Sequence, residues 1–72
     1  MSDLTAVQKV RLIARTLSKS MGELAEATGQ TRQNLSNKMS RGNLSEKDIL
    51  GLAEAMGCSV EIIFTMPDGT KV

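Results

Sequence analysis

The chain has 72 residues, of which 40% are hydrophobic and 24% charged, and its formal net charge is +1. A chain of this length forms one small domain that buries only about 60% of its unfolded surface, so association with a second copy would add stability. It contains no histidine, which excludes His-based acid–base catalysis, a serine triad and a His-ligated zinc site. The single cysteine, Cys58, has no partner for an internal disulfide and fits a reducing cytoplasm. No run of about 18 apolar residues and no signal peptide is recognisable, so no membrane segment is expected.

Four amphipathic helices are predicted, and their expected ranges are 5–18, 20–28, 31–40 and 45–56. The first has one apolar face, formed by Val7, Val10, Ile13, Ala14 and Leu17. Two helices begin with the spacing of a capping box, Ser20 with Glu23 and Ser45 with Asp48. Thr31 is the expected N-cap of the third helix, and Gly29 and Gly57 are expected to end the helices before them.

The segment 20–42 is the most informative part of the chain. It predicts two short helices joined at Gly29, the second with Leu35 and Met39 as its inner stripe. The outer positions of that second helix carry Arg32, Gln33, Asn34, Ser36, Asn37 and Lys38. Side chains of these types hydrogen-bond base edges and phosphates from the leading turns of a helix. The pattern therefore predicts a DNA-binding helix-turn-helix.

From about Val7 to Phe64 the chain resembles the lambda-repressor-like, or Cro-type, helix-turn-helix family. The resemblance is carried by an ordered set of short motifs: Glu23-Leu24-Ala25, Gly29, Thr31 to Ser36, Arg41-Gly42 and Leu52 to Gly57. It implies a mainly α, compact four-helix domain, here residues 1–58, and many members continue with a fifth helix; the composition of residues 59–72 instead predicts a C-terminal arm. The resemblance also implies that the helix 31–40 enters the major groove.

Three positions depart from the family pattern. Met21 stands where members often have a glutamine that touches a phosphate, and Gln30 stands where an aliphatic residue usually follows the turn glycine. Lys38 occupies another usually aliphatic position, with Met39 following it. These changes indicate an inner stripe shifted to Leu35 and Met39 on a slightly longer recognition helix.

Candidate DNA contacts fall into two groups, because base contacts specify sequence and phosphate contacts position the protein. Arginine can bond guanine O6 and N7 together, and glutamine or asparagine can do the same to adenine N6 and N7. The candidate base contacts are Arg32, Gln33, Ser36 and Asn37. The candidate phosphate contacts are Ser20, Thr31, Lys38, Arg41 and Asn43.

The charge is divided unevenly along the chain. Residues 1–43 carry seven basic and three acidic side chains, a net of +4, whereas residues 44–72 carry two basic and five acidic, a net of −3. The basic part coincides with the proposed DNA-facing half, as attraction to phosphate requires. A chance asymmetry on an ordinary solvated surface is the alternative.

After Gly57 the composition changes to β-branched residues, and Pro67-Asp68-Gly69 is a turn signal. A short strand over 60–66 is favoured over a fifth helix, with Thr70 to Val72 folding back as a hairpin arm. The expected dimer contacts are Val60, Ile62, Ile63, Phe64 and Met66. Alternatively, some of these side chains merely cover the base of the helical core.

These observations together predict a small cytoplasmic transcriptional regulator that binds double-stranded DNA as a homodimer on a palindromic operator. The family resemblance, together with simple occlusion of a promoter, favours a repressor over an activator. The main alternative is a protein-interaction module, such as an antitoxin bound to its toxin or a subunit of a phage complex, using the apolar C-terminal segment. Sequence-independent architectural binding would need a larger basic excess. No enzyme activity, catalytic residue, metal, cofactor, small-molecule substrate or membrane contact is expected.

Overall fold

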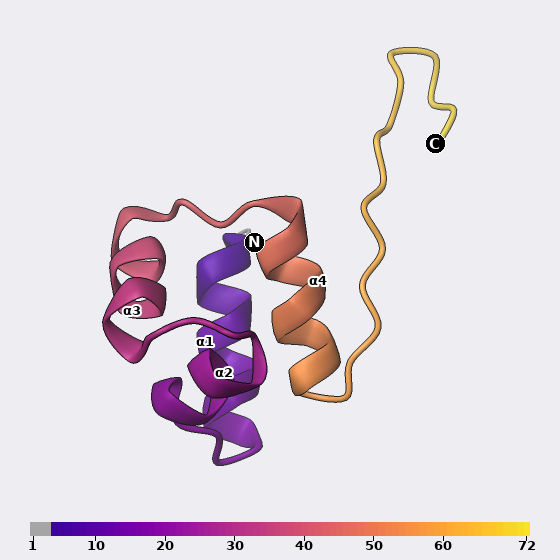
Figure 1. The fold of residues 1–72 in the computed structure, drawn as a ribbon. Coiled ribbons are helices and arrows are strands. Elements are labelled where there is room, and N and C mark those ends of the chain that lie inside the picture. The colour runs from indigo at the N-terminus through magenta and orange to yellow at the C-terminus, as the bar shows by residue number, and fades with distance from the viewer. Residues whose placement is uncertain (1–3) are drawn as a thin grey trace.

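The computed structural model describes residues 4–72 (Figure 1). Four helices follow one another: α1 (Ala6–Thr16), α2 (Met21–Ala27), α3 (Arg32–Arg41) and α4 (Glu46–Ala55). The expectation of a mainly α domain with four helices is therefore confirmed. Among residues 4–72, no helix has the length and apolar character needed to cross a bilayer.

Each helix begins at a hydroxyl residue whose side chain accepts a hydrogen bond from the third helical N–H group. These N-caps are Thr5, Ser20, Thr31 and Ser45. At Ser20, for example, the Glu23 N–H donates to Oγ at 3.1 Å, and the Glu23 carboxylate accepts the Ser20 N–H at 3.2 Å. Because such caps satisfy N–H groups that have no partner inside the helix, they set where each helix starts.

Each helix also ends in the same way, with one residue in the left-handed conformation. These residues are Ser18, Gly29, Gly42 and Gly57, with φ between 56° and 71°. After each of them, the next N–H donates to the carbonyl five residues back, as Lys19 does to Ala14 at 2.8 Å and Gln30 to Ala25 at 2.9 Å. Three of the four positions are glycine, for which this conformation carries no steric cost.

The core is aliphatic and lies where the four helices meet. Leu24, Leu35 and Leu52, one from each of α2, α3 and α4, are fully buried. Helix α1 adds Val10 and Ala14 to the same cluster.

The prediction that Leu17 belongs to the apolar face of the first helix is wrong. Helix α1 ends at Thr16, and the chain turns at the left-handed Ser18. Leu17 therefore projects outward and is exposed.

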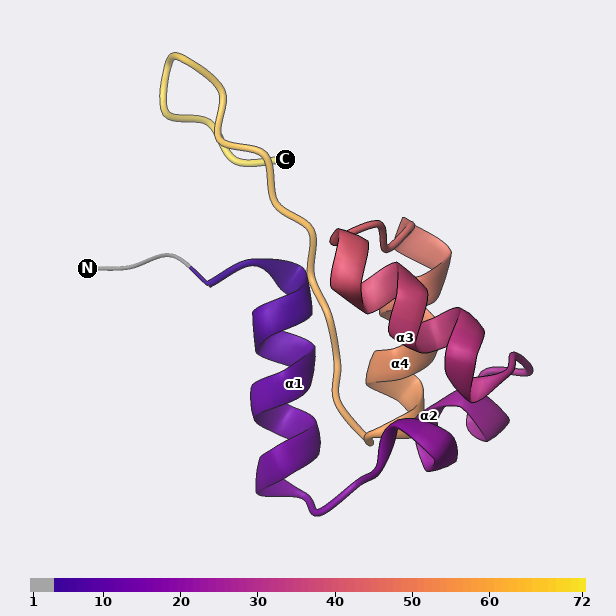
Figure 2. The ribbon, with the colours of Figure 1, turned by 90° about the vertical axis from the view of Figure 1, so that its left-hand side faces the viewer.

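The arm over residues 59–72 follows the end of α4, runs beside α1 and α4, and projects past their N-terminal ends (Figures 1 and 2). No strand is assigned in residues 4–72, and the arm contains no helix. A single antiparallel bridge, Thr65 to Lys71, closes the predicted turn. The fold-back of the last three residues is thus present, whereas residues 59–63 have no backbone hydrogen-bond partner within residues 4–72.

Candidate nucleic-acid interface

Helix α3 directs its polar side chains outward because its two apolar side chains are held in the core. Leu35 and Met39 are buried. The other positions between residues 32 and 37 are all exposed: Arg32, Gln33, Asn34, Ser36 and Asn37. The expected inner stripe is therefore confirmed, and the four candidate base contacts belong to the exposed surface of one helix.

The leading end of α3 carries no acidic side chain in its first turn. Thr31 accepts the Asn34 N–H at 3.0 Å, which leaves the Thr31 hydroxyl proton free to donate. Positive helix-dipole charge and Arg32 therefore meet at this end with no carboxylate in the same turn, an arrangement that attracts phosphate.

The start of α2 is electrostatically different. Ser20 and Glu23 form a closed capping box, so the Ser20 N–H is already bonded to a carboxylate. The negative charge of Glu23 would repel a phosphate approaching Ser20, which keeps only its hydroxyl proton for such a contact. Met21, the first residue of α2, packs against the core cluster. This position therefore offers no side-chain hydrogen bond to a phosphate.

Lys38 is engaged inside the protein. Its Nζ lies 3.0 Å from Oδ1 of Asp48, and the two side chains are 31% and 16% exposed. Asp48 also accepts the Ser45 N–H at 3.1 Å through Oδ2. The Ser45 backbone bond first, and the Lys38 bond second, hold the pKa of Asp48 below its usual value. A phosphate at Lys38 would have to share this ammonium with Asp48.

Arg32 and Arg41 form no ion pair, in contrast to Lys38, because the Lys38–Asp48 pair is the single ion pair within residues 4–72. Both arginines are exposed, as is Asn43, which follows the helix-ending Gly42. Their polar groups are available for a ligand. Of the candidate phosphate contacts, Thr31, Arg41 and Asn43 are thus the best placed by exposure and charge.

Two features near α3 had no clear signal in the sequence. One is the Lys38–Asp48 pair, which joins residues ten apart across a loop. The other is Gln30, whose Nε2 donates to Thr28 Oγ1 at 2.8 Å while its Oε1 is buried without a partner in the described chain. Gln30 thereby fills the turn between α2 and α3, where the family pattern has an aliphatic residue.

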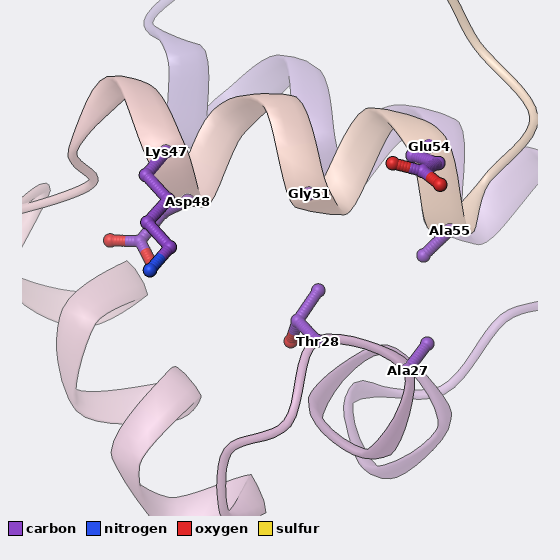
Figure 3. A pocket seen from close by; sticks show the side chains of 7 residues that line it. All are labelled: Ala27, Thr28, Lys47, Asp48, Gly51, Glu54 and Ala55. Carbon is purple, nitrogen blue, oxygen red and sulfur yellow. The ribbon is translucent and has the colours of Figure 1, made fainter.

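A shallow hollow of about 370 Å³ lies between the end of α2 and α4 (Figure 3). Gly51 faces the Thr28 methyl group there, and a β-carbon at Gly51 would lie 3.5 Å from it. The other lining side chains are Ala27, Lys47, Asp48, Glu54 and Ala55. Within residues 4–72 no group of three or more His, Cys, Asp or Glu side chains gathers as metal ligands would.

A second hollow of about 370 Å³ separates α1 and α4 from the first residues of the arm. It is mainly apolar, and Val10, Met56, Cys58, Val60 and Ile62 belong to its lining. The Cys58 thiol donates a weak hydrogen bond to the Met56 carbonyl at 3.7 Å. Of the expected dimer contacts, Val60 is half-buried, and the other four are exposed.

The chain matched none of the protein-family models, and searches of curated proteins and of solved structures gave no match either. The resemblance to the helix-turn-helix family therefore depends on the sequence motifs alone.

Proposed function

We propose that this protein is a small, sequence-specific DNA-binding regulator that represses transcription as a homodimer. The observation that supports this most is the outer surface of α3. It combines Arg32, Gln33, Ser36 and Asn37, all exposed, on a helix that Leu35 and Met39 fix against the core. A polar, carboxylate-free helix surface of this kind suits hydrogen bonding to base edges in the major groove.

Phosphate contacts would position α3 on the duplex. Thr31 stands at its leading end, and Arg41 and Asn43 stand at its trailing end. Contacts at both ends of one helix would fix its direction along the groove, while Lys38 and the Ser20 hydroxyl would add weaker contacts.

The dimer would form through the arm, with Val60, Ile62, Ile63, Phe64 and Met66 as its contacts. In Figure 1, the arm and α3 lie on opposite sides of the helical body. Pairing through the arm would therefore leave α3 of each copy uncovered. Repression would follow from simple occlusion of a promoter by the bound dimer.

The test is selection of bound sequences from a randomised duplex pool at two salt concentrations, with the Arg32→Ala and Gln33→Ala variants selected in parallel. We expect a palindromic motif with half-sites about 10 base pairs apart, because a twofold dimer presents its two reading helices about one helical turn apart. Each variant should relax the preference at one base pair of each half-site. Binding that enriches no sequence and disappears with salt would contradict the proposal.

A protein-interaction module is the second candidate, because the arm exposes large apolar side chains. Phe64 is 71% exposed and Ile63 is 56% exposed. Such a surface could bind a partner protein, as an antitoxin binds its toxin, and would not require Arg32 or Gln33. A chain that binds no DNA in the selection would favour this function.

A further inference from the structure

We propose that the outer face of α1 in one copy binds the outer face of α4 in a second copy. Leu12 is the centre of the first face and Leu50 the centre of the second, and the charged side chains around them are opposite in sign. The contact uses no residue assigned above to DNA or to the arm. This inference therefore does not depend on the proposed homodimer.

The basic side chains of the N-terminal half belong mainly to α1 and the turn after it. Residues 4–19 contain no acidic side chain and carry four basic ones: Lys9, Arg11, Arg15 and Lys19. All four are exposed, and none belongs to the single ion pair within residues 4–72. Helix α1 lies at one edge of the helical body (Figure 2), so its outer face is open to a partner.

An exposed leucine stands at the centre of the outer face of α1. Leu12 is 53% exposed. Lys9 and Arg15 lie about one helical turn before and after it, and helical geometry places them on opposite sides of it. An apolar group between two cations suits a partner that is both apolar and acidic, whereas a phosphate backbone would supply the charge alone.

The outer face of α4 has the same form with the opposite charge. Leu50 is 45% exposed, and Glu46 and Glu54 stand one turn before and one turn after it. Both carboxylates are exposed, and neither belongs to the single ion pair of the described chain. Lys47 is the one basic side chain of α4, so the face keeps a net negative charge.

Antiparallel packing brings the two leucines and the opposite charges together. When Leu12 lies against Leu50, the residues that follow Leu12 lie across from the residues that precede Leu50. Arg15 then faces Glu46, because helical geometry places both on the same side of the contact. An apolar centre with an ion pair beside it results.

The other side of the same contact is also matched. Lys9 precedes Leu12 and faces Glu54, which follows Leu50. Lys47 lies across from the uncharged Thr16, so no two like charges meet. Each basic side chain next to Leu12 thus has its own carboxylate on the second copy.

The helix ends favour this antiparallel direction. The end of α1 is basic, with Arg15 and Lys19, and it would lie near Glu46 at the acidic start of α4. Opposite ends of the two helix dipoles would also be neighbours. A parallel contact would bring like dipole ends together and would pair Arg15 with Glu54 instead.

A second copy is the partner that these faces indicate, because every copy carries both of them. The two faces differ, so the contact is head-to-tail, and each copy in a pair keeps one face unused. One helix from each copy makes a small interface, and exposed ion pairs contribute little each. Association is therefore expected at high protein concentration and should weaken with salt.

Nuclear magnetic resonance of the isotope-labelled full chain without DNA is the measurement. Raising the protein concentration should shift the backbone amide resonances of residues 8–16 and 46–54 together. Pairing through the arm would instead shift the amides of residues 59–72. The resonances therefore report this contact separately from the proposed homodimer.

Two leucine variants test whether one face binds the other. Leu12→Ser and Leu50→Ser should each raise the dissociation constant by about fivefold or more, because each removes apolar area from the contact. Unlabelled Leu50→Ser added to labelled Leu12→Ser should shift only residues 46–54 of the labelled chain. With the labels exchanged, only residues 8–16 should shift.

Leu17→Ser is the matched control, because Leu17 is 45% exposed, as Leu50 is, but lies beyond the end of α1. It should leave the association unchanged. An equal effect of Leu17→Ser and Leu12→Ser, shifts of the same face in both mixtures, or no concentration-dependent shift in residues 8–16 and 46–54 would overturn the proposal.

Charge reversal tests the direction of the contact. Glu54→Lys should weaken association by about threefold or more. Adding Lys9→Glu should restore it, whereas adding Arg15→Glu should not, although the two double variants have the same net charge. Restoration by Arg15→Glu alone would contradict the antiparallel pairing.

DNA selection is measured on separate samples, so this inference and the proposed function can fail independently. A chain that shows the α1–α4 contact but selects no DNA sequence would contradict only the proposed function. A chain that selects a DNA motif but shows no shift in residues 8–16 and 46–54 would contradict only this inference.

Discussion

Asp48 joins two helices through one carboxylate. Its Oδ2 accepts the Ser45 N–H at the start of α4, and its Oδ1 accepts the Lys38 ammonium from α3 at 3.0 Å. Helix α3 is therefore tied to α4 by a polar contact in addition to the packing of its apolar stripe. Because these bonds favour the ionised form, the pKa of Asp48 lies below the usual value.

Asp48→Asn should lower the free energy of unfolding by about 1–2 kcal/mol at neutral pH, because the variant loses charge-assisted hydrogen bonds. The folded-state pKa lies below the unfolded value of about 3.9. The carboxylate therefore stabilises the fold fully above the unfolded pKa, and this contribution is lost as pH falls through the folded pKa. Urea denaturation of both proteins between about pH 6 and pH 2 should show their difference shrinking.

Asp68→Asn is the matched control for this measurement. The Thr70 backbone bond lowers the pKa of Asp68 as well, but Asp68 lies in the exposed turn of the arm. Its removal should leave the unfolding of the helical body unchanged. A difference between the wild-type protein and Asp48→Asn that stayed constant with pH would argue against the assigned role of Asp48.

Gln30 carries a buried oxygen that has no partner in the described chain. Gln30→Met should raise the free energy of unfolding by about 1 kcal/mol, because a thioether of similar length fills the space without an unpaired acceptor. Thr28 would lose one bond but would still donate to Leu24 at 2.7 Å. Chemical denaturation measures the change, with exposed Gln33→Met as the control; a destabilised Gln30→Met would show that the amide contributes more than its oxygen costs.

At the scale of the element, the four helices share one design at both ends. A hydroxyl caps each start, and a left-handed residue followed by a bond to the carbonyl five residues back closes each end. Helix α1 is the exception in composition, because Ser18 adopts φ 56° where the other three helices have glycine. A non-glycine residue in this conformation costs free energy, since its β-carbon approaches the following carbonyl.

Ser18→Gly should therefore stabilise the fold by about 1 kcal/mol and raise the melting temperature by several degrees. Gly57→Ser, at the equivalent end of α4, should have the opposite sign for the same reason. Thermal unfolding followed by circular dichroism compares the pair. Two shifts of the same sign would mean that the left-handed conformation is not what sets these stabilities.

The sequence predicts those helix boundaries for which a local chemical signal exists. Serine followed by an acid at the third position identifies the starts of α2 and α4, and glycine identifies the ends of α2 and α4. The end of α1 lacks that signal, so Leu17 was wrongly predicted to belong to its apolar face. Local propensity also favoured a strand over 60–66, but a strand needs a partner strand, and one chain supplies only residues 70–72.

The candidate site is predictable to a similar extent. Periodicity alone separates Leu35 and Met39 from the polar positions of α3, and the structure confirms their burial. The engagement of Lys38 could not be inferred, because its partner Asp48 is brought near only by the packing of α3 and α4. Residue type and periodicity thus identify a surface, whereas the availability of each charge depends on the tertiary structure.

At the scale of the whole molecule, net positive and net negative charge belong to different parts of the chain. The net +4 of residues 1–43 includes α3, and the net −3 of residues 44–72 includes α4 and the arm. Since α3 and the arm lie on opposite sides in Figure 1, a duplex attracted to α3 would approach away from the acidic side chains of the arm. This polarity would orient the protein before any base is read.

Substitution of Arg32 and of Arg41 tests how α3 would contact DNA. Both are exposed arginines of α3, and they stand at its opposite ends. Arg32→Ala should cost about 1–3 kcal/mol at the selected site and relax one base preference, since Arg32 is a proposed base contact. Arg41→Ala should weaken all sequences about equally and reduce the salt slope by about one, because each lost phosphate contact releases fewer counterions. Fluorescence anisotropy with specific and scrambled duplexes over a salt series distinguishes the two effects. If Arg32→Ala instead lowered the affinity for every duplex alike, Arg32 would be a phosphate contact, and base reading would have to begin farther along α3.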